Sequence, residues 1–149
     1  MQLESVIEKI SEFETDTEVR ICRRAENDTC IAHQGDVYLW KVADNHPHSD
    51  KVWGNGRQVA VGTTKGSRHV ITGDVEVFEG TKLPAPVIKY LTDNNVPKET
   101  WSQYLGPTIV AKGETTLVHP EHAHHKVKFP ATMQVTYQVD TLTRKRVSD

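Results

Sequence analysis

The first hydrophobic pattern along the chain is helical. Between residues 3 and 13, apolar side chains recur every three or four positions, with glutamate and lysine between them. This spacing predicts an amphipathic N-terminal helix over residues 1–14, of about three turns, whose apolar face must be covered by another surface. The core of the same chain and a partner subunit are the two candidate covers. The apolar stripe comprises Leu3, Val6, Ile7, Ile10 and Phe13.

Beyond residue 16 the pattern changes to one of β-strands. Residues 17–21 alternate between polar and apolar, and residues 33–42 are rich in β-branched and aromatic side chains, with Gly35-Asp36 marking a turn or bulge. Further strands follow at short intervals, separated by glycine and proline. They are expected at residues 57–61, 68–72, 75–78, 108–111, 115–118, 126–129 and 132–139.

Two segments interrupt the β pattern. Residues 44–56 are polar and contain proline and glycine, which predicts a loop. Pro86 suits the first turn of one helix and Pro97 the start of a second, which predicts a short helical insertion at about 85–105. The pattern as a whole predicts a single, mainly β domain over residues 1–149. Its expected architecture is a small antiparallel β-barrel or sandwich with an N-terminal amphipathic helix and this insertion.

Composition narrows the class of protein. A length of 149 residues suits one domain, and the formal net charge of −2 does not predict nucleic-acid binding. No apolar run approaches the ~20 residues that a membrane-spanning helix needs, so a membrane partner is not expected. The N-terminus carries glutamates and lacks a basic, apolar export signal. Synthesis in the cytoplasm, without export by a signal peptide, is therefore expected.

Two cysteines, Cys22 and Cys30, flank the turn-like stretch at residues 25–28. If that stretch closes a hairpin, the two sulfurs lie opposite one another on adjacent strands. A disulfide and a pair of reduced thiols both remain open. Two cysteines are fewer than a disulfide scaffold contains, which favours the thiols.

The densest candidate chemistry is the turn at residues 119–125, with the sequence His-Pro-Glu-His-Ala-His-His. Neutral imidazoles bind transition metals, and a turn can direct two or three of them at one point. The sequence thus predicts a zinc or iron site, with Glu121 as a supporting base or fourth ligand. The candidate ligands are His119, His122 and either His124 or His69.

The same turn has a simpler interpretation. Pro120 excludes a helix interior, and the chain contains no helical His-Glu-x-x-His pattern. The alternative is a polar hairpin tip whose histidines are solvated or contact a neighbouring molecule. The distance of His69 from this turn decides between the two interpretations, because a lone strand histidine is more often a hydrogen-bonded structural residue.

Other catalytic frames are missing. Ser67 and Ser102 lack the glycine-flanked elbow of a hydrolase serine, and residues 62–67 lack the order of a phosphate-binding P-loop. The tail at residues 143–149 is basic, which suits a solvated terminus or an acidic patch on a neighbouring subunit. No aromatic-interleaved signature of RNA binding accompanies this charge.

Several short motifs resemble those of a family of small β-rich proteins from bacteria and tailed phages. The likeness runs over residues 34–149, and that family has no assigned activity. The resemblance implies a compact β fold and a phage origin. This chain has Ser67 where the family has the first histidine of Gly-His-x-His, which weakens a shared metal site. The motifs are QGDV at 34–37, GSRH at 66–69, HPEH at 119–122, Pro130, YQ at 137–138 and RVSD at 146–149.

Three hypotheses of function follow. The first is a non-enzymatic structural or interaction protein, a minor or decorating component of a phage virion, whose partners are other protein subunits or further copies of itself. Its contacts would come from the N-terminal helix, the insertion and the tail. The second is a histidine-ligated metal-binding protein or metal-dependent enzyme. The third is a phage-encoded regulator that binds a host protein or small ligand in a pocket framed by residues 44–56 and the insertion. The side chains predicted to contact partners are Leu3, Val6, Ile10, Arg144, Lys145 and Arg146.

Overall fold

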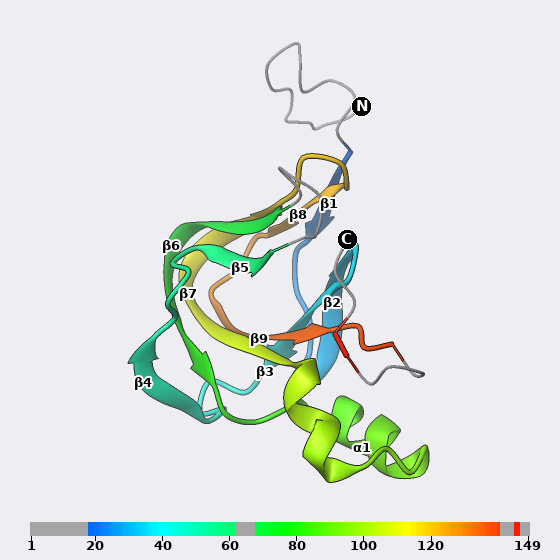
Figure 1. Cartoon of the computed structure of the whole chain (residues 1–149). Coiled ribbons are helices and arrows are strands. Elements are labelled where there is room, and N and C mark those ends of the chain that lie inside the picture. The colour runs from blue at the N-terminus through cyan, green and yellow to red at the C-terminus, as the bar shows by residue number, and fades with distance from the viewer. Residues whose placement is uncertain (1–17, 62–67, 141–144, 147–149) are drawn as a thin grey trace.

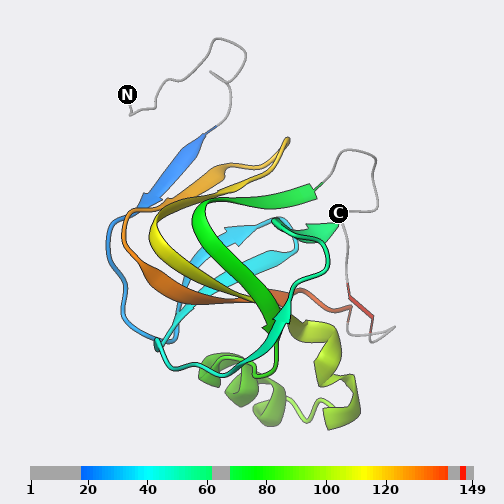
Figure 2. The same ribbon diagram turned by 90° about the vertical axis from the view of Figure 1, so that its left-hand side faces the viewer.

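The computed structural model describes residues 18–61, 68–140 and 145–146. In this part of the chain, nine strands form one strongly curved sheet that closes almost into a barrel, with the two helices beneath one end (Figure 1, Figure 2). The predicted mainly β class and barrel-like architecture are confirmed. The predicted N-terminal helix lies outside the described residues. The elements are β1 (Val19–Cys22), β2 (Thr29–Gln34), β3 (Val37–Val42), β4 (His48–Val52), β5 (Gln58–Val61), β6 (Arg68–Gly80), α1 (Ala85–Asp93), the 3₁₀-helix η2 (Lys98–Tyr104), β7 (Leu105–Val118), β8 (His124–Val127) and β9 (Ala131–Tyr137).

The two longest strands, β6 and β7, pair antiparallel and curve along the wall of the barrel (Figure 2). Their register shifts between Gly73 and Val75, where a β-bulge interrupts the ladder. Gly73 has a φ of +110°, and a Cβ there would lie 2.5 Å from the carbonyl oxygen of Glu114. Only glycine fits such a position. Residues 68–72 and 75–78 were predicted as two strands but form the single strand β6, and residues 108–111 and 115–118 likewise form the single strand β7. The prediction was wrong because the glycine between each pair lies at a bulge and not at a chain reversal.

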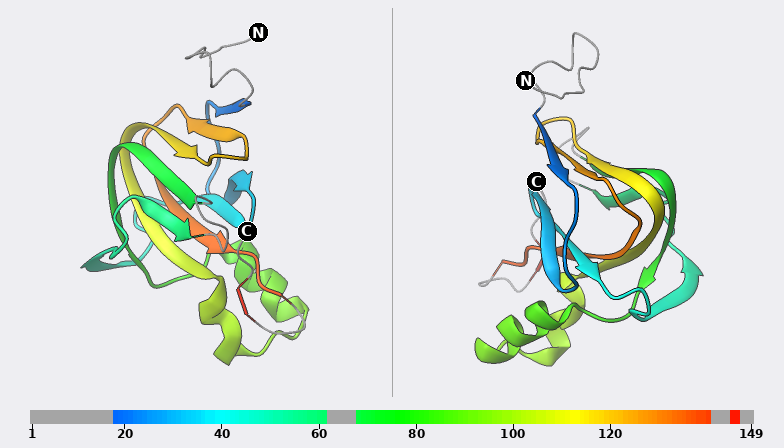
Figure 3. Two further views of the ribbon diagram at one scale, coloured as in Figure 1. Left: turned by 45° about the horizontal axis from the view of Figure 1, so that its top comes forward. Right: turned by 180° about the vertical axis from the view of Figure 1, so that it is seen from behind.

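The edge of the sheet corrects a second prediction. Strand β1 pairs in parallel with β8 and not with β2, so residues 25–28 do not close a hairpin (Figure 3). Cys22 and Cys30 are both free thiols. The hairpin lies one turn further on, where β2 and β3 pair antiparallel around Gly35-Asp36. The predicted turn at that dipeptide is confirmed, and residues 33–42 form two strands.

The segments between the strands follow the prediction in part. Residues 44–56 contain β4, which pairs with one end of β6, so this stretch is not entirely a loop. The helical insertion is confirmed as α1 and η2, with Pro86 in the first turn of α1 and Pro97 directly before η2. Neither helix of the described chain is long and apolar enough to cross a membrane.

Strand β9 is buried on both of its faces. Its inward residues, Met133 and Val135, join the hydrophobic core with Leu39, Ile71 and Ile109. Its outward residues are polar but satisfied. The side-chain amide of Gln134 donates to the carbonyl oxygen of Gly106 at 2.8 Å and accepts from the hydroxyl of Thr108. Because the Gln134 amide has these partners, its burial costs little free energy, and its hydrogen bonds fix β9 against β7.

Side chains, not a continuous ladder, close the barrel between β2 and β8. The amide nitrogen of Gln34 on β2 donates to the carbonyl oxygens of Leu117 at 3.0 Å and Ala123 at 2.7 Å. From β8, the buried His125 ring hydrogen-bonds the backbone of His33. Strand β8 is already paired with β1 and β7, so these two side chains supply hydrogen bonds between β2 and this part of the sheet.

The seam makes stability depend on pH. Burial, assisted by the nearby Arg20 guanidinium, lowers the pKa of His125 from 6.5 to about 4. As pH falls from 6.5 towards 4, His125 becomes protonated in the unfolded chain but stays neutral in the folded chain. The free energy of unfolding therefore falls. We expect a loss of about 2 kcal/mol over this range, after allowance for solvent screening. Urea unfolding at several pH values measures it.

The control for this prediction is His125→Gln, which keeps a side-chain N–H donor and removes the titratable group. It should flatten the stability curve between pH 6.5 and 4 while leaving the acid loss from carboxylates below that range. A variant whose curve keeps the same slope would show that another group is responsible.

Candidate functional site

The predicted histidines meet in a buried cluster at one end of the barrel. We define the histidine cluster as Asp36, His69, His119 and His122. The ring centroids of His69 and His119 lie 4.4 Å apart, and those of His119 and His122 lie 4.3 Å apart. His69 and His119 are fully buried. The fold therefore brings His69 from β6 to the turn that follows β7, which sequence spacing alone did not show.

Both ring nitrogens of His69 face acceptors. The Nδ1 atom lies 2.9 Å from Oε1 of Gln34, whose amide nitrogen is already committed to two backbone carbonyls. The Nε2 atom lies 3.2 Å from Oδ1 of Asp36, an ion-pair contact without the alignment of a hydrogen bond. Both ring nitrogens of His69 thus face neighbouring oxygens.

Arg146 completes this polar network. Its guanidinium lies 3.1 Å from Oδ2 of Asp36 and stacks 4.0 Å from the ring centroid of Tyr137. The hydroxyl of Tyr137 in turn donates to the carbonyl oxygen of Val59 at 2.6 Å. The part of the tail that contains Arg146 is therefore tied into the barrel. Lys145 is exposed, and Arg144 lies outside the described residues.

Ring nitrogens of two further histidines have backbone partners. Nδ1 of His119 accepts the backbone N–H of Glu121 at 2.9 Å, and Nε2 of His124 lies 3.2 Å from the carbonyl oxygen of His119. The rings of His69, His119 and His122 thus lie together, with 6.3 Å between the centroids of His69 and His122. Among the described residues, no group of three or more histidines, cysteines or acids is arranged to hold a metal ion. The zinc or iron hypothesis gains no support from this arrangement.

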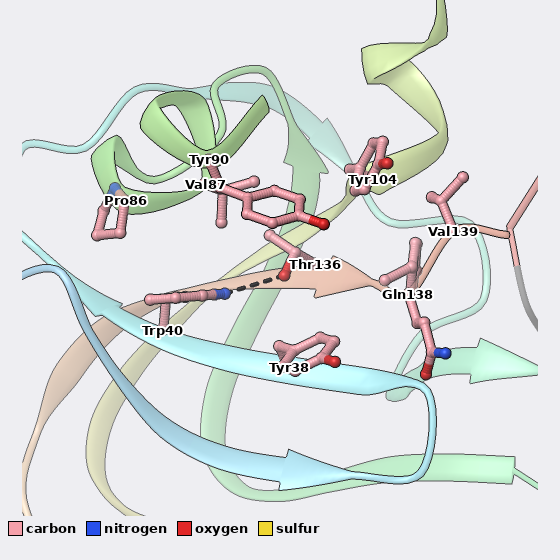
Figure 4. A pocket seen from close by; sticks show the side chains of 10 residues that line it. Tyr38, Trp40, Pro86, Val87, Tyr90, Tyr104, Thr136, Gln138 and Val139 are labelled. Carbon is pink, nitrogen blue, oxygen red and sulfur yellow. Dashed lines mark hydrogen bonds between the residues drawn. The ribbon is translucent and has the colours of Figure 1, made fainter. Parts of the chain in front are cut away.

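A second site, which sequence reasoning missed, lies on the outside of the sheet. It is a pocket of about 390 Å³ between the helical insertion and strands β3 and β9 (Figure 4). Its size falls within the range of small-molecule and peptide sites. We call it the aromatic groove; its lining residues are Tyr38, Trp40, Pro86, Val87, Tyr90, Tyr104, Thr136, Tyr137, Gln138 and Val139.

The side-chain periodicities of strand β3 and helix α1 explain how the groove is formed. Residues alternate between the faces of a strand, so Tyr38 and Trp40 point outward from β3 while Leu39 points into the core. From α1, Val87 and Tyr90 face them across the pocket, because residues three apart share a helix face (Figure 4). Tyr104 at the end of η2 forms a further wall. Four separate elements thus build one aromatic surface.

All four tyrosines of the chain line this groove. Burial raises the pKa of the Tyr38 phenol, and nearby Cys30 and Tyr90 raise it further. Burial likewise raises the pKa of Tyr137 to about 12. The phenols of Tyr38 and Tyr137 are therefore neutral at physiological pH, and the hydroxyl of Tyr137 already donates to the carbonyl oxygen of Val59.

Two side chains of the groove are held by neighbours, and its lining carries no charge. The indole N–H of Trp40 donates to the hydroxyl of Thr136 at 2.9 Å, which fixes the indole ring (Figure 4). The ring of His33 stacks on Tyr38 with 4.2 Å between centroids, supporting it from the β2 side. None of the ten lining residues is an acid, a lysine, an arginine or a histidine. Residues 44–56, predicted to frame a pocket, do not line this one.

Comparison with models of protein families, with curated proteins and with solved structures found no match. The resemblance to small phage and bacterial proteins therefore stays a prediction. Because a fold alone does not specify a function, the chemistry of the two sites has to carry the functional conclusion.

Proposed function

We propose that this protein is a non-enzymatic binding domain that recognises a partner through the aromatic groove. The observation that carries this proposal is the convergence of all four tyrosines and Trp40 on one pocket. Aromatic side chains offer a large contact area at a small cost in conformational entropy, and they are enriched at binding surfaces. Tyr90 is 55% exposed, so its ring is accessible to a partner.

The chemistry of the lining favours binding over catalysis. Histidine, cysteine, serine and carboxylates are missing from the groove lining, and the one threonine hydroxyl there, that of Thr136, accepts from the indole of Trp40. The acid–base groups of the histidine cluster are instead engaged with one another inside the barrel. We assign that cluster a structural role, which is to fix the β2–β3 hairpin and the tail around the end of the barrel.

The proposal agrees with one element of the assembly hypothesis. The helical insertion, expected to carry contacts, supplies one wall of the groove through α1 and η2. The role as a virion component and the identity of the neighbouring subunits remain predictions.

A fragment screen by NMR tests the proposed function. Protein labelled with ¹⁵N is mixed with a panel of small neutral fragments, and we expect the largest shift changes at the amides of Tyr38, Trp40 and Tyr90. A ligand that binds only the folded state should also raise the unfolding temperature. Fragments that bind only elsewhere, for example around the exposed Ile21 or Val52, would contradict the proposal, as would a panel with no hit.

A further inference from the structure

We infer that the partner segment is proline-rich and binds the aromatic groove as a polyproline II helix. This inference rests on the proposed function and names the class of ligand. Extended proline-rich segments dock into grooves lined with aromatic side chains, and their preformed conformation lowers the entropy cost of binding. Three properties of this groove select such a ligand over other classes: its backbone, its hydrogen-bonding groups and its charge.

The backbone of the groove excludes strand addition. Strand β3, which carries Tyr38 and Trp40, is paired with β2 on one side and with β9 on the other. Its N–H and C=O groups are therefore committed to the sheet, and a peptide lying over it finds no free edge. The ligand must be a segment that needs no ladder of backbone hydrogen bonds. A polyproline II helix meets this condition, because it has no internal hydrogen bonds and forms none with a strand.

The hydrogen-bonding groups of the groove suit a ligand rich in acceptors. Tyr38 and Tyr90 contribute phenol hydroxyls, and Gln138 contributes a side-chain amide. Proline residues expose carbonyl oxygens that accept hydrogen bonds, and they lack the N–H groups that would require acceptors in the wall. A sugar would bring many hydroxyl groups into a pocket with few polar partners, and buried hydroxyls without partners are costly.

The charge of the groove excludes polyanions. Nucleic-acid sites use lysine and arginine to neutralise phosphates, and the groove lining contains neither. The aromatic faces could also hold a quaternary ammonium group by cation–π attraction. The lining offers no carboxylate to assist that attraction, so the uncharged proline ring, which packs flat on tyrosine and tryptophan, is the better match.

The test is titration of ¹⁵N-labelled full-length protein with decaproline, capped by acetyl and amide groups. A Gly-Ser peptide of equal length is the matched control, because it is extended, neutral and flexible. We expect saturable shift changes at the amides of Tyr38, Trp40 and Tyr90 with decaproline alone. Tyr90→Ala should weaken binding at least tenfold, as removal of a central aromatic contact does. Tyr90→Phe, which keeps the ring, should retain most of the affinity.

Controls separate this inference from the proposed function. Tyr90 is largely exposed, so its replacement should leave the fold intact, and Val52→Ala on the exposed face of β4 should leave binding unchanged. If cellohexaose or tetramethylammonium shifts the groove amides and decaproline does not, the proline-rich ligand is wrong and the groove remains a binding site. If decaproline binds equally well to Tyr90→Ala, the inference is also wrong. If no probe, including the neutral fragments, reaches the groove, both proposals fail.

Discussion

Replacing Asp36 by alanine is expected to lower the free energy of unfolding by about 3–5 kcal/mol. The carboxylate is 2% exposed, and its two oxygens face Arg146 at 3.1 Å and the buried His69 at 3.2 Å. Its removal would leave the partly buried Arg146 guanidinium without its counter-charge and the buried His69 ring without one of its two neighbouring oxygens. Breaking one member of a buried ionic network costs far more than the network contributes, because the remaining charge stays desolvated. Urea unfolding followed by far-UV circular dichroism measures the loss.

A matched control is available on the surface of the same sheet. Glu76 and Lys112 form an exposed pair, with 3.8 Å between charged atoms, whose carboxylate is 57% exposed. Glu76→Ala should therefore change stability by less than about 1 kcal/mol. If Asp36→Ala behaves like this surface variant, the buried network does not hold the end of the barrel. In the double variant Asp36→Ala/Arg146→Met we expect part of the loss to be recovered, since the unpaired cation is gone.

The second large effect is expected for Gln34→Leu, at about 3 kcal/mol or more. The leucine has a similar size, but it removes one hydrogen-bond partner from each of three groups: the carbonyl oxygens of Leu117 and Ala123 and the ring of His69. A buried polar group left without a partner costs about 1–3 kcal/mol. Because Gln34 bridges β2 to the end of β7 and the turn before β8, its loss should also open the seam of the barrel.

Amide hydrogen exchange tests this second prediction at the level of individual strands. In Gln34→Leu, amides of β2 and β8 should exchange faster relative to those of the central strands β6 and β7, because local opening follows the weakened contacts. Gln138→Leu is the matched control, since this glutamine is exposed and its replacement should cost no more than about 0.5 kcal/mol. Uniform acceleration in all strands would show that Gln34 supports global stability without closing the seam.

The histidine cluster and the aromatic groove are connected through Tyr137. The histidine cluster holds together residues from the β2–β3 hairpin, β6 and the turn after β7. Tyr137 connects it to the aromatic groove, because Arg146 stacks on its ring while Tyr137 itself lines the pocket. The polar network thus fixes a wall of the groove from below. A wall that is already held in place needs less ordering when a partner binds.

The sequence by itself determined the type of most elements. Alternation of polar and apolar residues identified the strands, and Pro86 and Pro97 located the helical insertion, because both signals are local properties of the backbone. Gly35-Asp36 was correctly assigned to a turn for the same reason. The glycine at position 73 shows the limit of such local signals. A glycine suits a chain reversal and a β-bulge equally well, and only pairing with β7 selects the bulge.

Tertiary structure alone decided the parallel pairing of β1 with β8 and the composition of both sites. The four tyrosines are spread over 100 residues of chain, from Tyr38 to Tyr137, and no spacing rule links them. Their convergence depends on strand order and on where the insertion packs, which are long-range properties. The histidines were visible in the sequence, but the direction of each ring nitrogen was not. That direction depends on partners such as Gln34 and Asp36, which the fold brings from distant positions.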